Sequence, residues 1–247
     1  MSYIKMMTFK KINLLGIGFS DATEKEILEY IVTGLENKSE KYYIVTPNPE
    51  LLVIASGDSK YKAILNNAKL ALPDGIGVIM AGQLLGKPLK ERIHGVDLVE
   101  TLCSEVSRKP ITVGFLGAGP SVAIKTAECL QKKYLGLKVG LVSQEWSEDL
   151  KSQKVDILFV AFGSPKQEIW ISENLEKLPA KVVVGVGGAF DFISGNVRRA
   201  PVIVRKIGLE WLFRLIIQPW RIKRQLRLIQ FVYLVSMEKL GFKKFTP

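Results

Sequence analysis

Asp74 is the residue in this sequence that is best placed for acid–base chemistry. It lies in LALPDGIGVIM, where a short apolar run of strand length ends at Pro73 and a helical pattern begins after Gly75. Open α/β sheets bind their ligands at the carboxyl ends of the strands, and a carboxylate at such an end can accept a proton. An aspartate here can also cap the following helix through backbone N–H groups. The sequence leaves both roles open, catalytic base and helix cap.

Two further loops carry groups that suit the recognition of a sugar or a phosphate. In TPNPE, Thr46 and Asn48 follow an apolar run, and the prolines around them restrict the backbone, so both side chains are held in fixed positions. The alternative for both residues is helix capping. In FLGAGPSVA, Gly117 and Gly119 lie between a strand-like run and a helical pattern. That arrangement is typical of loops whose backbone N–H groups approach a phosphate.

Two more loops place polar side chains and glycines at equivalent positions. After the apolar run ILFVAF, the segment GSPKQE supplies Lys166, Gln167 and Glu168. After the last apolar run, the segment GVGGAFDF supplies Gly187, Gly188 and Asp191. Because the carboxyl ends of parallel strands meet at one edge of a sheet, these loops predict one shared crevice for an elongated ligand that carries phosphate.

The elements that must hold these loops follow from the spacing of apolar residues. Apolar runs of strand length fall at residues 12–17, 42–46, 69–72, 111–117, 137–142, 155–161 and 181–186. Helical patterns fall between most of them, at 23–36, 49–66, 75–85, 96–108, 120–134 and 165–177. Strands that are apolar throughout and alternate with helices are typical of a covered parallel sheet. The sequence therefore predicts an α/β fold, with an open, mostly parallel Rossmann-like sheet and helices on both faces.

Charge divides the chain unevenly. Residues 198–247 hold 12 Lys or Arg and two acids, in a chain whose net charge is +11. We therefore expect an α/β core over 1–197 and a basic helical C-terminal appendage over 198–247. Aromatic and aliphatic residues alternate with the cations of the appendage at helical spacing, which indicates an amphipathic helix on an anionic membrane surface. A basic helix packed on its own domain is the alternative.

Other features of the composition indicate a compartment. The two cysteines give no disulfide framework, which fits a reducing cytoplasm. The sequence contains no run of about 18 apolar residues, so it predicts no transmembrane helix. The first apolar run ends in a glycine turn and lacks a cleavage site, so it is not expected to be a signal peptide. The expected location is cytoplasmic, with peripheral binding to the inner face of the cell membrane. A homo-oligomer is left open.

Six motifs in register give the sequence a family resemblance. TPNPE, LPDGIG, ERIHGVDL, GSPKQE, GVGGAFDFISGNVRRAP and GLEWLFRLIIQPWR follow one another within residues 12–235. Together they resemble the WecG/TagA/CpsF glycosyltransferase family. The resemblance implies an inverting enzyme that moves a hexosamine-type sugar, best matched by N-acetylmannosamine, from a UDP-sugar to undecaprenyl-diphosphate-linked N-acetylglucosamine. Such a reaction would serve the biosynthesis of teichoic acid or another surface polysaccharide.

The resemblance also implies roles for the loop residues. Asp74 matches the catalytic base of the family. Thr46 and Asn48 would position the sugar or the base, and Gln167 would bind the acceptor or the developing charge. An inverting transfer needs these functions, because one group takes the proton of the acceptor hydroxyl while others stabilise the departing diphosphate.

The departing diphosphate must then be met by side chains and backbone N–H groups. The aspartates contain no Asp-x-Asp motif for a metal, and the sole histidine, His94, is expected in a structural turn, with a ligand or base role as the alternative. We therefore expect no metal site and no cofactor. Arginines bind phosphate groups by bidentate hydrogen bonds and are the candidates for this task. They are Arg92, Arg214, Arg221 and Arg224.

Two other classes of protein fit single features of the sequence. An NAD(P)-dependent oxidoreductase would use Gly117 and Gly119 for the pyrophosphate and an acidic residue such as Glu145 for the ribose. A nucleic-acid-binding module would use the basic appendage, but the long aliphatic side chains there favour lipid over a phosphate backbone. The expected partners are therefore the UDP-sugar, the lipid-linked acceptor and the membrane, and no nucleic acid.

We predict that sugar transfer persists in excess EDTA, because the sequence lacks an Asp-x-Asp motif and offers arginines for the diphosphate instead. The measurement is the initial rate with and without chelator, with a metal-dependent glycosyltransferase as the positive control for chelation. Activity that disappears with EDTA and returns with Mg²⁺ or Mn²⁺ would contradict the prediction.

Overall fold

The core of the fold is a sheet of six parallel strands in the order β4-β3-β8-β7-β5-β6. The computed structural model describes residues 8–37 and 40–246, apart from the side chains of residues 223–225. The strands are β3 (Tyr42–Val45), β4 (Leu70–Ala71), β5 (Thr112–Gly117), β6 (Lys138–Ser143), β7 (Ile157–Ala161) and β8 (Val182–Gly185). The predicted open parallel sheet is confirmed.

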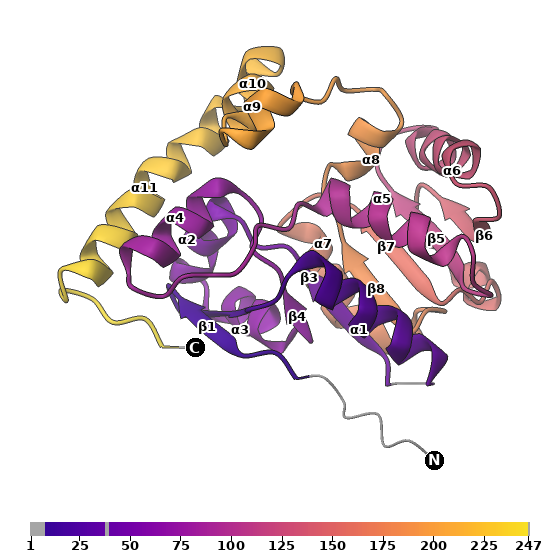
Figure 1. Ribbon diagram of the computed structural model, residues 1–247, viewed down its shortest axis with the longest axis horizontal. Coiled ribbons are helices and arrows are strands. Elements are labelled where there is room, and N and C mark those ends of the chain that lie inside the picture. The colour runs from indigo at the N-terminus through magenta and orange to yellow at the C-terminus, as the bar shows by residue number, and fades with distance from the viewer. Residues whose placement is uncertain (1–7, 38–39, 247) are drawn as a thin grey trace.

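Helices cover both faces of this sheet, as the sequence predicts. One face holds α1 (Glu24–Glu36), α5 (Gly95–Val106), α6 (Val122–Lys133) and α8 (Ala189–Ile193), of which α1 and α5 lie in front in Figure 1. The other face holds α2 (Pro49–Gly57), α3 (Ser59–Asn67), α4 (Ile76–Leu84) and α7 (Lys166–Asn174). Successive strand residues serve opposite faces, because Ile44 packs with the first group while Tyr43 and Val45 pack with the second. Short 3₁₀ turns occur at Glu148–Ser152, Leu175–Lys177 and Pro219–Arg221.

The first apolar run differs from its prediction. Residues 12–17 do not form a strand of the main sheet. They belong to a separate antiparallel hairpin of β1 (Lys11–Leu14) and β2 (Ile17–Ser20). The turn between them has positive φ at Leu15 (51°) and Gly16 (84°), as a tight two-residue hairpin requires. The turn at Leu15 and Gly16 thus falls inside the residues that were predicted as one strand, and Leu15 is buried like Leu14 and Ile17.

The predicted helix over 49–66 is two helices, α2 and α3. The break falls at Asp58, which ends α2 and whose carboxylate accepts a hydrogen bond from the backbone N–H of Tyr61 at 3.0 Å. Asp58 therefore starts α3 as its N-cap. The junction reads SGDSK over residues 56–60, so Gly57 and Asp58 mark the helix break in the sequence, and the prediction of a single helix is wrong.

The C-terminal segment forms α9 (Val202–Lys206), α10 (Glu210–Ile217) and α11 (Ile222–Lys239). In Figure 1, α11 runs beside α2 and α4, and the end of the chain lies close to the β1–β2 hairpin. Phe231, Leu234 and Val235 of α11 are buried in the core on that face of the sheet. Two ion pairs add to this packing, Arg227 with Glu50 at 2.5 Å and Lys87 with Glu238 at 2.6 Å. The segment therefore packs on the body, and the division of the chain at residue 197 stays a prediction.

We predict that Leu234→Ala lowers the free energy of unfolding by about 2–5 kcal/mol, the usual cost of emptying a buried leucine site. Tyr233→Ala on the exposed side of the same helix is the control and should change it by less than about 0.5 kcal/mol. Urea denaturation measures both changes. Equal effects of the two substitutions would show that α11 does not pack as described.

Candidate active site

A cavity of about 1330 Å³ lies at the carboxyl edge of the sheet. The strands β3 and β8 are neighbours in the sheet, but the helices that follow them cover opposite faces. The helix α8 after β8 packs on one face, and α2 after β3 packs on the other. Divergence of this kind opens the crevice in which α/β folds bind ligands. The predicted site residues that line it are Thr46, Asn48, Asp74, Arg92, Gly119, Gln167, Gly187, Gly188, Asp191, Arg214 and Arg221.

Asp74 forms the centre of the polar part of the cavity. Its Oδ1 lies 2.7 Å from Nδ1 of His94, the residue that directly precedes α5. The alternative that Asp74 caps the next helix is wrong, because α4 has Gly75 as its N-cap and no side chain bonds to its first turn. The carboxylate faces the cavity and His94 instead of the helix, which fits the predicted role of a base.

Thr46 and Asn48 hold the neighbouring loop. The Thr46 hydroxyl donates to the carbonyl oxygen of Gly185 at 3.3 Å, which ties the end of β3 to the end of β8. The Asn48 side chain accepts from the backbone N–H of Leu51 at 3.2 Å and caps α2. The capping alternative is therefore confirmed for Asn48. Both residues also line the cavity, so a contact with a ligand is compatible with these bonds.

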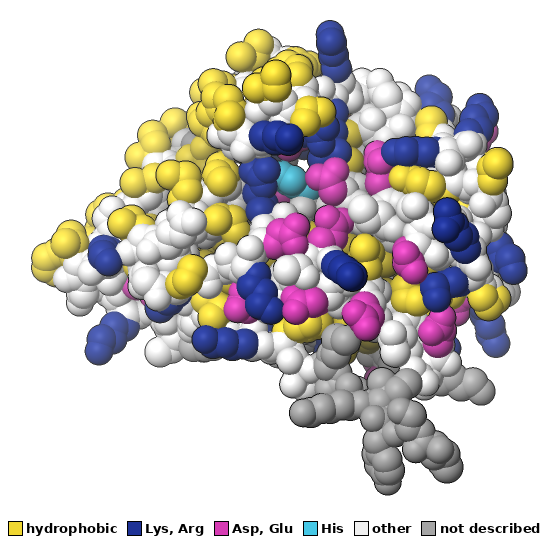
Figure 2. All heavy atoms as spheres, viewed as in Figure 1, with side chains coloured by type: hydrophobic (Ala, Val, Ile, Leu, Met, Phe, Trp, Pro, Cys, Tyr) yellow, Lys and Arg dark blue, Asp and Glu magenta, His cyan; other side chains and the backbone are white. Residues whose placement is uncertain are grey.

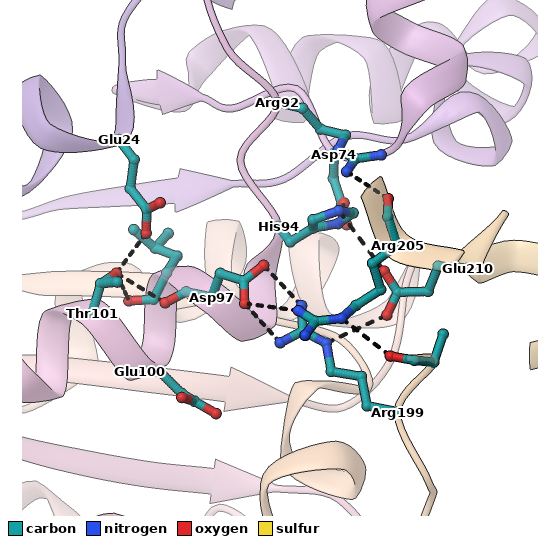
Figure 3. Close-up of polar contacts among 12 residues, drawn as sticks. Glu24, Asp74, Arg92, His94, Asp97, Glu100, Thr101, Arg199, Arg205 and Glu210 are labelled. Atoms are coloured by element: carbon teal, nitrogen blue, oxygen red, sulfur yellow. Dashed lines mark hydrogen bonds and ion pairs between the residues drawn. The ribbon is translucent and has the colours of Figure 1, made fainter. Parts of the chain in front are cut away.

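His94 lies between two carboxylates. Its other ring nitrogen, Nε2, is 3.8 Å from Oε2 of Glu210, the first residue of α10 (Figure 3). Burial lowers the pKa of His94, but its hydrogen bond and ion pair with Asp74, aided by Glu210, outweigh burial and raise the pKa overall. This contact could not be inferred from local sequence, because Glu210 lies far along the chain from Asp74 and His94.

Arg199 fixes Glu210 in place. Its guanidinium forms a bidentate pair with Asp97 of α5 at 2.6 and 2.8 Å, and its Nε lies 3.4 Å from Oε1 of Glu210 (Figure 3). Burial raises the pKa of Asp97, but the hydrogen bonds and charge of Arg199 hold that pKa below its ordinary value. Among the described residues, no group of three or more His, Cys, Asp or Glu side chains is arranged to hold a metal ion.

Gln167 is a buried residue whose side-chain amide bonds to the protein itself. Its Oε1 accepts from the backbone N–H of Gly187 at 2.9 Å, and its Nε2 donates to Glu168 at 2.8 Å and to Ser164 at 3.1 Å. These bonds join α7 to the turn after β8. Gln167 lines the cavity, yet the contacts favour a role in holding the Gly187–Gly188 turn over the predicted direct role in acceptor binding.

Glu168, Lys166 and Gly117 lie away from the cavity, contrary to their predicted roles in ligand binding. Glu168 is buried and accepts hydrogen bonds from Tyr61 and Ser164, and burial raises the pKa of its carboxyl group. Lys166 is exposed at the start of α7, outside the cavity lining. Gly117 has φ of 109° and meets the end of β7 so closely that a Cβ would lie 2.8 Å from the carbonyl carbon of Ala161.

The C-terminal segment places arginines at the cavity. Arg214 stacks its guanidinium 4.6 Å from the ring centroid of Phe192 and approaches Gly188, where a Cβ would lie 2.6 Å from Nη2. Arg221 lines the same cavity, as does Arg92, whose Nη2 donates to the carbonyl oxygen of Arg205 at 3.0 Å. The side chain of Arg224 lies outside the described residues. Arg92, Arg214 and Arg221 thus line the same cavity as Asp74.

Apolar side chains line another part of the cavity. The helix α4 begins beside Asp74, and its later turns carry Met80 and Leu84, which face the cavity together with Ile229 and Val232 of α11. We call these four residues the apolar arm. The apolar arm could not be predicted from local sequence, because the arm combines two helices that lie far apart in the chain. The cavity therefore offers cations and a carboxylate in one part and hydrocarbon in another.

These features define an α/β enzyme that handles an anionic ligand, and comparison with known proteins gives its family. A family model described as the glycosyl transferase WecG/TagA/CpsF family matches residues 12–245. A similar protein from Bacillus spizizenii is 36% identical over 233 residues, which cover 92% of this chain and 90% of that protein. One from Staphylococcus aureus is 32% identical over 242 residues, or 95% of each chain. Both are named N-acetylglucosaminyldiphosphoundecaprenol N-acetyl-beta-D-mannosaminyltransferase. The chain belongs to the WecG/TagA/CpsF family and is a glycosyltransferase.

We predict that Asp74→Asn lowers kcat by about 10²–10⁴-fold, because the amide keeps the size of the side chain but cannot take a proton. The melting temperature should change little, since Asn retains an oxygen that accepts a hydrogen bond from His94. Steady-state kinetics and thermal unfolding measure the two quantities. Turnover equal to that of the unsubstituted enzyme would exclude Asp74 as the base.

Proposed function

We propose that this glycosyltransferase transfers N-acetylmannosamine from a UDP-sugar to undecaprenyl-diphosphate-linked N-acetylglucosamine, with inversion at the anomeric carbon. The observation that carries the proposal is the single cavity that joins Asp74, the arginines and the apolar arm. The names of the relatives from Bacillus spizizenii and Staphylococcus aureus support the same sugar and acceptor. A cell-surface polymer such as teichoic acid is the proposed destination of the product.

The reaction needs two events, and the cavity has groups for each. Asp74 accepts the proton of the acceptor hydroxyl through Oδ2, while its Oδ1 stays bonded to His94. The acceptor oxygen forms a bond to the anomeric carbon, and the bond from that carbon to the diphosphate oxygen breaks on the opposite side. Arg92, Arg214 and Arg221 then offset the negative charge that develops on the departing UDP.

The apolar arm supports a lipid-linked acceptor. A soluble sugar acceptor has no need of Met80, Leu84, Ile229 and Val232, whereas the first isoprene units of a polyprenyl chain would bury them. Ile229 is 70% exposed and Met80 60% exposed, so contact with a lipid would remove much apolar surface from water. The arm thus leads from the diphosphate-binding arginines toward the surface where a membrane-bound chain would enter.

A large apolar surface continues from this arm. Figure 2 shows hydrophobic side chains gathered over the region of α9, α10 and α11, with the histidine at its edge between basic and acidic side chains. Its most exposed members are Ile203, Ile207, Ile216, Trp220, Ile229, Val232, Leu240 and Phe242. Among the described residues, no helix has the length and apolar character that a membrane crossing requires. We propose peripheral binding to the inner face of the cell membrane through this surface and the exposed Lys239, Lys243 and Lys244.

The structure removes the main argument for an NAD(P)-dependent oxidoreductase. Gly117, which would meet the pyrophosphate, packs against β7 and does not line the cavity. Membership of a glycosyltransferase family also disfavours a nicotinamide reaction. We therefore carry only the transferase function forward.

The experiment that tests the proposal is a transfer assay with a panel of UDP-sugars and a short-chain lipid-diphosphate-N-acetylglucosamine acceptor. We expect UDP-N-acetylmannosamine to be used best and the product to have the opposite anomeric configuration to the donor, as read by NMR. Transfer of another sugar would correct the donor. Absence of transfer from every UDP-sugar would overturn the proposed function.

We predict that Ile229→Asp raises the KM for a long-chain lipid-linked acceptor by at least about tenfold, because a buried isoleucine contributes about 1.5–3 kcal/mol and a buried charge is costly. The KM for a water-soluble acceptor that carries no isoprene unit should change less than about twofold, because such an acceptor does not reach the arm. Ile124→Asp on α6, an exposed isoleucine away from the cavity, is the matched control. Equal effects on both acceptors would show that the arm does not hold the lipid.

A further inference from the structure

His94 is the only histidine of the chain, and it connects two segments that are distant in sequence. Asp74 approaches its Nδ1 at 2.7 Å from the loop after β4. Glu210 approaches its Nε2 at 3.8 Å from α10 of the C-terminal segment. The imidazole therefore lies between the candidate base and a carboxylate that is brought in by a separate part of the fold (Figure 3).

The two distances constrain where the protons of His94 lie. An ionised carboxylate can only accept a hydrogen bond, so Nδ1 carries a proton and donates it to Asp74. The atom Nε2 is buried and makes no hydrogen bond with the described residues. In the neutral ring this atom would turn a lone pair toward the Glu210 carboxylate, which is repulsive. In the imidazolium ion it would turn a positive N–H toward the same carboxylate, which is attractive.

We propose that His94 is a positioning residue for Asp74 and that Glu210 controls the charge on His94, so that the C-terminal segment sets the basicity of the candidate base. This inference rests on the proposed function in one respect, the role of Asp74 as the base. It adds that the residue which controls this base, Glu210, lies outside the loop that carries Asp74.

The other charged groups around the ring determine how strongly Glu210 acts. Arg92, from the loop before α5, faces the ring and opposes its protonation. Asp97 lies in the first turn of α5, but its carboxylate is bound by Arg199 and also faces Arg205 at 3.9 Å. Arg199 contacts both Asp97 and Glu210, and its contact with Glu210 keeps the Glu210 carboxylate directed at the imidazole ring. The net direction is that the pKa of His94 lies above its ordinary value.

The charge on His94 changes the chemistry of Asp74 in a defined direction. An imidazolium beside Asp74 stabilises the carboxylate and makes it a weaker base, whereas a neutral imidazole with a proton on Nδ1 orients the same carboxylate and leaves it more basic. The reaction transfers one proton from the acceptor hydroxyl to Asp74, and His94 neither gains nor loses a proton in that step. We therefore expect kcat to rise with pH through the pKa of His94.

The first test follows the His94 imidazole by NMR in protein labelled with ¹⁵N-histidine and free of a histidine tag. The whole chain gives one histidine signal, so its titration needs no assignment. We expect Glu210→Gln to lower the pKa of His94, because it removes the carboxylate charge that faces Nε2. Asp74→Asn should lower it as well. The ¹⁵N shifts should place the proton of the neutral ring on Nδ1.

Glu238→Gln is the matched control for this titration. Glu210 and Glu238 are the two acids of residues 198–247, and Glu238 binds Lys87 on the far side of the C-terminal segment. Its removal should leave the pKa of His94 unchanged. An equal shift of the His94 pKa in both variants would show that only the net charge of the protein matters, which would contradict the inference. Absence of a shift in Glu210→Gln would overturn it. A neutral ring with its proton on Nε2 would overturn it as well.

The second test is the pH profile of kcat. The Glu210→Gln variant should reach its plateau at a lower pH than the unsubstituted enzyme, by the same shift that the NMR titration measures, with little change in KM for the donor. His94→Asn keeps a donor for Oδ1 and should retain kcat within about threefold at high pH while losing this ionisation, whereas His94→Ala should lose more. A profile that keeps the ionisation in His94→Asn would contradict the assignment. If no UDP-sugar is transferred but the NMR titration shifts as expected, the proposed function fails and the control of His94 by Glu210 stands.

Discussion

The bidentate ion pair between Arg199 and Asp97 is the contact on which the candidate active site depends. It joins α5, which packs on the sheet, to the chain that leaves α8 and crosses to the C-terminal helices. A planar guanidinium that meets a carboxylate through two hydrogen bonds fixes direction as well as distance. Once Arg199 is fixed, Glu210 has a defined partner and reaches His94, and His94 reaches Asp74. The polar part of the cavity is thus assembled from two segments that are distant in sequence, one that holds Asp74, His94 and Asp97 and one that holds Arg199 and Glu210.

Much of the fold was predictable because its signals are local. Strands such as 155–161 and 181–186 are apolar throughout, and each is followed by glycine or proline, so the parallel sheet and the loops at its carboxyl edge could be inferred. The same reasoning placed Thr46, Asn48 and Asp74 at one crevice. It failed at Leu15–Gly16 and at Asp58, where a tight turn and a helix N-cap divide segments that were each predicted as one element.

The parts of the site that sequence reasoning missed are those that depend on packing between distant segments. Arg199 and Glu210 lie inside motifs that were recognised, GNVRRAP and GLEWLF, yet nothing local indicates that they fold back onto the loop of Asp74. Glu168 shows the opposite error. A polar residue at the start of a helix suggested ligand contact, but its carboxylate is directed into the protein, where Tyr61 and Ser164 donate to it. Local sequence gives the position of a residue in an element and cannot give the direction of its side chain.

The close approach of Arg214 to Gly188 has a consequence for substitution at residue 188. No side chain fits at residue 188 while the guanidinium occupies that space, since even a Cβ would lie 2.6 Å from Nη2. A larger residue at 188 would require the guanidinium, which is the far end of a flexible side chain, to leave its place over Phe192. Substitution at residue 188 is therefore coupled to the position that the Arg214 side chain takes in the cavity.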